Sequence, residues 1–401
     1  MSTALAPPSA ESRRARTAVA ALFLTNGALF ANLVPRFPEI KADLALDNAA
    51  YGVAIAAFPA GAVVAGLAAA VVIRRLGSGR AAVLGTILTA IGTVLAGFSP
   101  SLLVFAGALA FAGATDAITD VAQNSHGLRV QRRYGRSIIN SFHAIWSIGA
   151  VLGGSMAAGA IALGLPRAVH LSISGVLFAA VALTALRFLL RGRDDETAAE
   201  PGAAPVVRVR IRPRVVLLLA ALVAVAIAGT LVEDAASTWA AVYLGGSLGA
   251  TAAVAAYGFV ALVGAQFVGR ILGDRLVDRF GQRTVLRVGG AIAALGMGAA
   301  LAFPSVPGTI AGFAAAGFGL ATTVPAAMHE ADEIRGLRAG TGVTIVSWLM
   351  RLGFLLSPPI VGLVADGAGL RVGLLVVPIA GVVAVLLAGV LGRRRTTGVA
   401  S

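Results

Sequence analysis

Three polar side chains, Asp116, Asp120 and Asn124, occupy every fourth position at the end of an apolar stretch. On an α-helix this spacing places them on one face, with Gln123 beside it. Carboxyl groups can carry protons, but at membrane depth they cost about 2.5–3.5 kcal/mol each on insertion scales. They persist there mainly where they face a bundle interior or a water-filled path. If the rest of the chain crosses a membrane, this stretch therefore predicts part of a transport pathway.

Other polar groups inside apolar segments are candidates for the same substrate or proton pathway. His143 and Trp146, in the next segment, are expected at the depths of Asp120 and Asp116 respectively. A contact between His143 and Asp120 would be either a proton relay or a simple hydrogen bond. Trp146 could stack on a sugar or an aromatic substrate, or only pack. Asn26, near the middle of the first apolar segment, could bind substrate hydroxyl groups.

Glu233 and Asp234 are expected to break a later apolar segment toward its outer end. There they would line an outer vestibule or cap a broken helix. Trp239 and Tyr243 follow at helical spacing, and the simplest interpretation of this pair is an aromatic belt at the membrane interface.

Arg351 lies near the middle of another apolar segment, too far from either end for its guanidinium group to reach water easily. An arginine at this depth needs a carboxylate partner or an anionic substrate. The available acids are Asp116, Asp120, Glu233 and Asp234. Arg351 therefore belongs either to the pathway or to a static ion pair in the second half of the chain.

The composition places most of the chain in lipid. Of the 401 residues, 58% are hydrophobic and 12% are charged, whereas a soluble domain carries about 25% charged residues. The 50 glycines suit membrane helices that pack through small side chains. The absence of cysteine excludes disulfides and thiolate chemistry. No nucleophile–base or metal-ligand cluster is evident, so neither an enzyme nor a cofactor nor a metal site is expected.

Twelve apolar segments are long enough to span a bilayer as helices, for which about 17–25 residues suffice. We therefore predict an all-α membrane protein with two six-helix bundles, 17–190 and 214–391, joined by a cytoplasmic linker, 191–213. Short tails, 1–16 and 392–401, complete the chain. The predicted spans are 17–38, 49–73, 81–98, 101–125, 137–163, 168–190, 214–243, 251–273, 284–303, 307–328, 339–364 and 371–391.

The net charge of +14 would suit a nucleic-acid partner, but its distribution indicates membrane topology instead. Nearly all Lys and Arg residues, Arg270 among them, fall in loops expected on one side of the membrane. The opposite side would carry Arg36, Lys41, Arg167 and Arg371. This is the positive-inside pattern, so both termini are expected in the cytoplasm. The first residues do not have the pattern of a cleaved signal peptide.

The two halves of the chain align at a constant separation of 204 residues. Residues 73–77, Ile-Arg-Arg-Leu-Gly, match residues 277–281, Val-Asp-Arg-Phe-Gly, and Gly113 matches Gly317. These landmarks suggest a duplicated six-helix unit. Parallel repeats of six helices are the architecture of major facilitator transporters.

Over essentially its full length the chain resembles the major facilitator superfamily. The loop signature of that family, Gly-x-x-x-Asp-Arg-x-Gly-x-Arg, has its better copy in the second half. The resemblance implies that this motif biases one conformational state. The first-half copy departs from the signature, with Arg74 at the aspartate position. The second-half motif residues are Asp274, Asp278, Arg279, Gly281 and Arg283.

A narrower resemblance is to the fucose-permease-like branch of bacterial permeases, which implies substrate and proton sites in a central cavity. A further motif, 149–154, is similar to the antiporter signature of the family, with Ala150 in place of proline. The alternative interpretation of this motif is close packing between helices through small residues. The fucose-permease-like motifs are Arg36-x-Pro38-x-Ile40-Lys41, Asp120-Val121-Ala122-x-Asn124, Ser141-Phe142-His143-Ala144, Trp239-x-x-x-Tyr243-Leu244 and Gly353-Phe354-Leu355-x-x-Pro358-Pro359.

Together these observations predict a proton-coupled secondary transporter that moves a small polar organic solute, such as a sugar, across the cytoplasmic membrane by alternating access. It would be a monomer in membrane lipid, with no nucleic-acid partner. Two alternatives stay open. A proton antiporter would export a drug or metabolite on the same fold, and a membrane receptor or scaffold would bind its ligand without flux.

Overall fold

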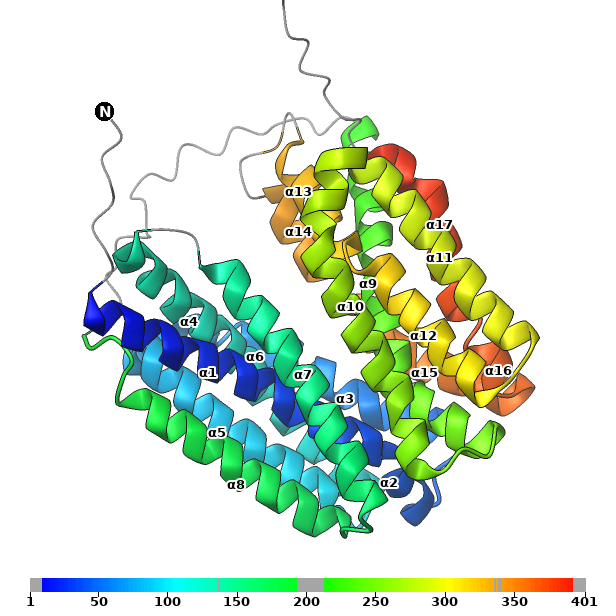
Figure 1. Ribbon diagram of the computed structural model, residues 1–401, viewed down its shortest axis with the longest axis horizontal. Helices are drawn as coiled ribbons and strands as arrows, with labels where there is room; N and C mark the ends of the chain where they lie inside the picture. The colour runs from blue at the N-terminus through cyan, green and yellow to red at the C-terminus, as the bar shows by residue number, and fades with distance from the viewer. Residues whose placement is uncertain (1–8, 136–137, 193–212, 335–336, 338–340, 392–401) are drawn as a thin grey trace, which may run out of the picture. The chain divides into compact units, whose positions relative to one another are not determined.

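The computed structural model describes residues 9–135, 138–192, 213–334, 337 and 341–391 (Figure 1). The chain divides into two units, Met1–Ala204 and Pro205–Ser401, and each is described by itself. The predicted linker, 191–213, lies almost wholly outside the described residues, as do the tail 392–401 and the first half of the tail 1–16.

The described part of the N-terminal unit is helical, and its long helices run alongside one another (Figure 1). Helix α6 extends nine residues beyond the predicted span and ends at Gly135, whose φ of 74° is the left-handed conformation that glycine adopts easily. The elements are α1 (Ala10–Leu33), η1 (Val34–Arg36), α2 (Phe37–Asp43), α3 (Asn48–Gly66), α4 (Ala69–Leu76), α5 (Ser78–Gly97), α6 (Leu102–Tyr134), α7 (Ile139–Ala162) and α8 (Arg167–Leu186).

The described part of the C-terminal unit is also helical, but three of its spans are interrupted. The breaks separate α12 from α13, α14 from α15 (at Met350) and α16 from α17. The elements are α9 (Pro213–Val242), the π-helix η2 (Tyr243–Ser247), α10 (Ala252–Phe280), α11 (Gln282–Ala302), α12 (Val306–Leu320), α13 (Thr323–Asp332), α14 (Thr341–Leu349), α15 (Arg351–Ala368), α16 (Leu370–Gly373), α17 (Val376–Leu387) and η3 (Ala388–Val390).

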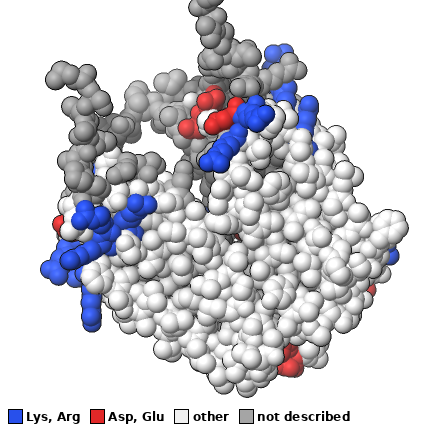
Figure 2. Space-filling model, viewed as in Figure 1, with Lys and Arg blue, Asp and Glu red and all other residues white. Residues whose placement is uncertain are grey.

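Among the described residues, 12 helical stretches are long and apolar enough to cross a membrane. The predicted all-α fold with twelve spans is therefore confirmed. Figure 2 shows few Lys, Arg, Asp or Glu side chains across the middle of the visible face, and most of those it draws lie near its margins. Large apolar side chains such as Val176 and Leu295 are more than 70% exposed, as expected for a surface that faces lipid.

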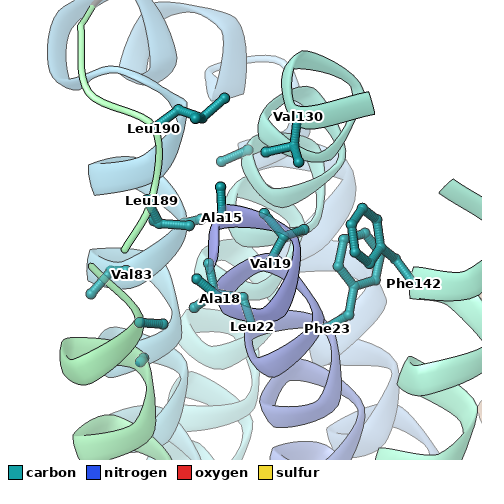
Figure 3. Packing of buried hydrophobic residues seen from close by; sticks show 14 of the residues in the cluster. Ala15, Ala18, Val19, Leu22, Phe23, Val83, Val130, Phe142, Leu189 and Leu190 are labelled. Atoms are coloured by element: carbon teal, nitrogen blue, oxygen red, sulfur yellow. The ribbon is translucent and has the colours of Figure 1, made fainter. Parts of the chain in front are cut away.

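One buried cluster holds the N-terminal unit together near the start of α1. Figure 3 shows Val19, Leu22 and Phe23 of α1 packed against side chains from α5, α6, α7 and the segment that follows α8. The rings of Phe23 and Phe142 stack with their centroids 5.4 Å apart. This packing fixes α1 against α7, the two helices that carry Asn26 and Trp146.

The 204-residue repeat recurs as contacts inside each unit. Arg167 donates through Nε to the carbonyl oxygen of Gly97 at 2.7 Å, and Arg371 donates in the same way to the carbonyl oxygen of Leu301 at 2.6 Å. Each arginine thereby satisfies a carbonyl group at the end of a helix, where backbone acceptors lack helical donors. The repeat therefore extends to the polar contacts that join spans within each unit.

Close approach between helices explains the matched glycines. A Cβ atom at Gly113 of α6 would overlap the carbonyl oxygen of Phe58 of α3, and one at Gly317 of α12 would overlap that of Leu262 of α10. We expect Gly113→Ala to lower the melting temperature and the folded yield, because backbone rather than a flexible side chain would have to move. Gly107→Ala on the same helix is the matched control, since its Cβ meets nothing within 4 Å. Equal behaviour of the two variants would contradict this explanation.

Candidate functional site

Asp116, Asn26 and Trp146 lie on three different helices and are joined by hydrogen bonds. Asn26 of α1 donates through Nδ2 to Oδ1 of Asp116 on α6, at 2.6 Å. Trp146 of α7 donates through Nε1 to Oδ1 of Asn26, at 2.8 Å. Asn26 is buried, whereas Asp116 and Trp146 are half-buried. The structure thus brings three of the sequence-predicted residues into one chain of hydrogen bonds, here called the N-unit triad.

Small residues place α1 and α7 close enough to form the N-unit triad. A Cβ atom at Gly27 would overlap the carbonyl oxygen of Trp146, and one at Gly149 would overlap that of Leu24. The glycines of the 149–154 motif therefore serve close helix packing, which was the alternative interpretation of that motif.

The N-unit triad fixes the orientation of each member. Because the indole N–H can only donate, it holds the Asn26 oxygen toward Trp146 and the amide nitrogen toward Asp116. Within the described residues Asp116 has no ion-pair partner. Its carboxyl group is therefore positioned by a neutral amide rather than neutralised by an arginine in the part of the chain that the structure describes.

One turn further along α6, Asp120 and Asn124 form a second polar group. Asn124 donates through Nδ2 to both the Oδ1 and the backbone oxygen of Asp120, at 3.0 Å and 2.9 Å. Asp120 is exposed and Asn124 is half-buried, while His143 is exposed with its ring edge-on to Phe23 at 5.3 Å between centroids. Asp116, Asp120 and Asn124 share the expected face of α6. A contact between His143 and Asp120 stays a prediction.

Helix α9 runs unbroken from Pro213 to Val242, so the expected helix break at Glu233 and Asp234 is wrong. The neighbouring helix α10 supplies polar partners for Glu233. Its Oε2 accepts a hydrogen bond from Nε2 of Gln266 at 2.8 Å and lies 3.7 Å from Nη2 of Arg270. Arg270, assigned to a loop from the sequence, lies inside the span Ala252–Gly273. The ion pair explains why both charges are tolerated there.

Asp234, Trp239 and Tyr243 are all buried. Asp234 is 6% exposed, and Trp239 and Tyr243 are 0% and 1% exposed. The interpretation of the aromatic pair as a belt at the membrane interface is therefore wrong, because belt residues must reach the headgroup region.

Glu233 and Arg270 provide a stability prediction. Glu233→Gln or Arg270→Gln alone should lower the melting temperature, because each leaves an uncompensated charge inside a span. The double variant should recover most of that loss, by about 1 kcal/mol or more for a partly exposed pair. Thermal unfolding of the three purified variants measures the coupling. Additive losses would show that the pair contributes nothing.

Arg351 begins α15 directly after the break at Met350. The break is held by Thr230 of α9, whose Oγ1 donates to the carbonyl oxygen of Met350 at 3.1 Å. Arg351 is half-buried, and among the described residues of the C-terminal unit no acid lies within ion-pair distance of it. Glu233, one expected partner, is paired with Arg270 instead. The structure therefore shows no static pair for Arg351 within its own unit.

The second-half loop motif lies at the junction of α10 and α11. Asp274, Asp278 and Arg279 fall in the last turns of α10, and Gly281, with φ of 81°, makes the turn. Arg283, at the start of α11, donates through Nε and Nη2 to the carbonyl oxygen of Leu391 at 3.2 Å and 2.9 Å, and also to that of Gly389. The motif thus fastens the start of α11 to the end of the last described helix.

The sequence alone did not single out three polar residues of the C-terminal unit that make contacts in the structure. Gln266 binds Glu233, Thr230 binds Met350, and Ser357 faces Asp234. One signal was available, since Gln266 and Arg270 stand four residues apart inside an apolar segment and so share a helix face.

Twelve spans, two six-span units that repeat their internal contacts, and polar side chains at membrane depth define a multi-pass membrane protein of the transporter class. The family model of the Major Facilitator Superfamily matches residues 19–277 and 265–400. The chain belongs to this superfamily.

A relative in Sinorhizobium fredii, the uncharacterized transporter y4wD, is 30% identical over 93% of this chain and 97% of its own length. Among solved structures, the nucleoside transporter NupG superposes with a TM-score of 0.70 at 13% identity, over 95% of this chain and 98% of that one. FucP, a superfamily transporter in the outward conformation, gives 0.59 at 17% identity, over 94% and 98%. These two likenesses are to the fold, so membership of the fucose-permease-like branch is not established.

Proposed function

We propose that the protein is a proton-coupled secondary transporter that moves a small polar organic solute, such as a sugar, across the cytoplasmic membrane by alternating access. It would act as a monomer with both termini in the cytoplasm. The observation that carries this proposal is the N-unit triad, in which an amide and an indole position a carboxyl group at membrane depth, with no counter-charge among the described residues.

The N-unit triad offers both functions that such a transporter needs. Asp116 can exist with or without a proton, and its Oδ1 already accepts a hydrogen bond, which leaves Oδ2 to exchange protons or to bind the solute. The second N–H of Asn26 and the half-exposed ring of Trp146 can bind a hydroxyl group and a sugar face. The charge on Asp116 and the solute contacts would therefore depend on each other.

Arg351 supports a polar solute from the C-terminal unit. A half-buried arginine inside a span, with no acid paired to it among the described residues of its unit, favours a hydrogen-bonding or anionic ligand. Asp120, Asn124 and His143 add hydrogen-bonding groups on the N-terminal side. The Arg283 contacts with the end of the last described helix would set the balance between conformational states, the role implied for the loop motif.

The test begins with a thermal-shift screen of the purified protein against sugars, organic acids and drugs. The compound giving the largest shift is then used in proteoliposomes with an imposed pH gradient. An inwardly directed proton gradient should drive accumulation of that compound. Accumulation driven only by the opposite gradient would replace symport with antiport, and binding without counterflow would indicate a receptor.

A further inference from the structure

Several buried side-chain oxygen atoms of the C-terminal unit make no hydrogen bond of ordinary geometry among the described residues. Two of them, Oδ2 of Asp234 on α9 and Oγ of Ser357 on α15, belong to helices that pack against each other. The two residues are 6% and 2% exposed. Buried polar atoms are nearly always satisfied, and a buried carboxylate without compensation is costly. This pair is therefore the strongest indication of a ligand in the unit.

The packing of α9 against α15 places the two groups opposite each other. The two helices belong to odd-numbered spans, so they run in the same direction. Thr230 abuts Gly353, where an added Cβ would overlap the Thr230 hydroxyl oxygen. One turn further along each helix come Asp234 and Ser357. Ser357 and Thr238 both interact with the carboxyl group of Asp234, so three oxygen-bearing side chains converge.

The backbone of α15 adds further acceptors in the same turn. Pro358 and Pro359 lie inside the helix and have no N–H groups. The carbonyl oxygens of Phe354 and Leu355 therefore lack their helical donors. Backbone carbonyls released in this way coordinate small cations in other membrane transporters.

The charges around Asp234 favour a cation over a polar solute. The neighbouring acid, Glu233, is already balanced by Gln266 and Arg270, whereas Asp234 forms no ion pair within the described residues. The cluster offers carboxylate, hydroxyl and carbonyl oxygen atoms, and the hydroxyl groups of Thr238 and Ser357 keep lone pairs for a cation when their hydrogens point to Asp234. In the part of the chain that the structure describes, no three His, Cys, Asp or Glu side chains group to hold a metal ion, so a single carboxylate with hydroxyls suits a monovalent ion.

We propose that Asp234, Thr238 and Ser357 form a binding site for a small monovalent cation, sodium in particular, between α9 and α15. The ion would neutralise Asp234 and use the hydroxyl and carbonyl oxygens as ligands. It would hold α9 against α15 beside the proline pair. The site is separate from the N-unit triad and does not depend on the proposed proton coupling.

The test uses the purified full-length protein at fixed pH and ionic strength, with choline replaced stepwise by sodium. Sodium should raise the melting temperature in a saturable manner, and radioactive sodium should bind in a scintillation proximity assay. Asp234→Asn, which keeps the side-chain shape, should weaken sodium binding at least about tenfold, and Ser357→Ala should weaken it less. Thr309→Ala is the matched control, because it also removes a buried hydroxyl without a partner, on α12.

Absence of sodium binding by the wild-type protein, or equal binding by Asp234→Asn, would overturn the proposal. A response of Asp234 to pH alone, with no difference between sodium and choline, would overturn it in favour of a proton. Asp116→Asn separates the two proposals, since it should keep sodium binding whether or not it loses proton-driven transport.

Discussion

Replacement of Asp116 by asparagine is expected to abolish proton-driven accumulation of the transported solute while leaving solute exchange in place. Asparagine keeps the shape of the side chain and can still bond to Asn26, so the helix contacts of the N-unit triad should survive. It cannot take up a proton. The link between the proton gradient and the solute is then lost, and accumulation should fall by about 10- to 100-fold, the usual scale of coupling.

The matched control for Asp116 is Asp120→Asn, one turn away on the same helix. Asp120 is exposed and accepts a hydrogen bond from Asn124, so its replacement should reduce accumulation less. The measurement is uptake into proteoliposomes with and without a pH gradient, together with counterflow of labelled solute without a gradient. If Asp116→Asn accumulates solute as the wild type does, Asp116 is not the proton carrier.

Replacement of Arg351 by glutamine is expected to remove solute binding without loss of stability. Removing one partner of a buried ion pair costs about 3–5 kcal/mol, but Arg351 pairs with no acid among the described residues of its unit. Its replacement therefore leaves no charge uncompensated there, and the melting temperature should stay the same or rise. Solute affinity should fall at least about tenfold, because a hydrogen bond to a charged group contributes about 1.5–3 kcal/mol.

Arg270→Gln is the matched control for Arg351→Gln, since it also removes an arginine inside a span of the same unit. It should lower the melting temperature, because Glu233 would lose its counter-charge. Its effect on solute affinity should be smaller than that of Arg351→Gln. The two variants are compared by thermal unfolding and by solute-dependent thermal shift. Marked destabilisation by Arg351→Gln would show that the arginine has a structural partner.

The apolar pattern was sufficient to predict the fold, because a bilayer demands long helices whatever the details of packing. It was also sufficient to select Asn26, Asp116 and Trp146, since polar groups in apolar segments are rare and depth can be counted along a helix. The spacing did not reveal that Asn26 joins the other two. That contact depends on close approach of α1 and α7 through Gly27 and Gly149.

The errors in the C-terminal unit have a common physical cause. Glu233 was expected to break α9, and Arg270 was placed in a loop, because each was considered alone. Paired across α9 and α10, the two charges are tolerated inside regular helices. The burial of Trp239 and Tyr243 was missed because helical spacing is the same for a buried face and an interfacial belt.

The central claim is that water reaches polar side chains of each unit at membrane depth, Asp120, Trp146 and Arg351 among them. It is tested most directly by cysteine labelling, since the natural chain contains no cysteine. Single cysteines at positions 120, 146 and 351 would be exposed to a positively charged thiol reagent that cannot enter lipid. The account expects rapid labelling at these three positions and none at the lipid-facing control positions 176 and 295. Labelling at none of the three, or equal labelling at the controls, would contradict it.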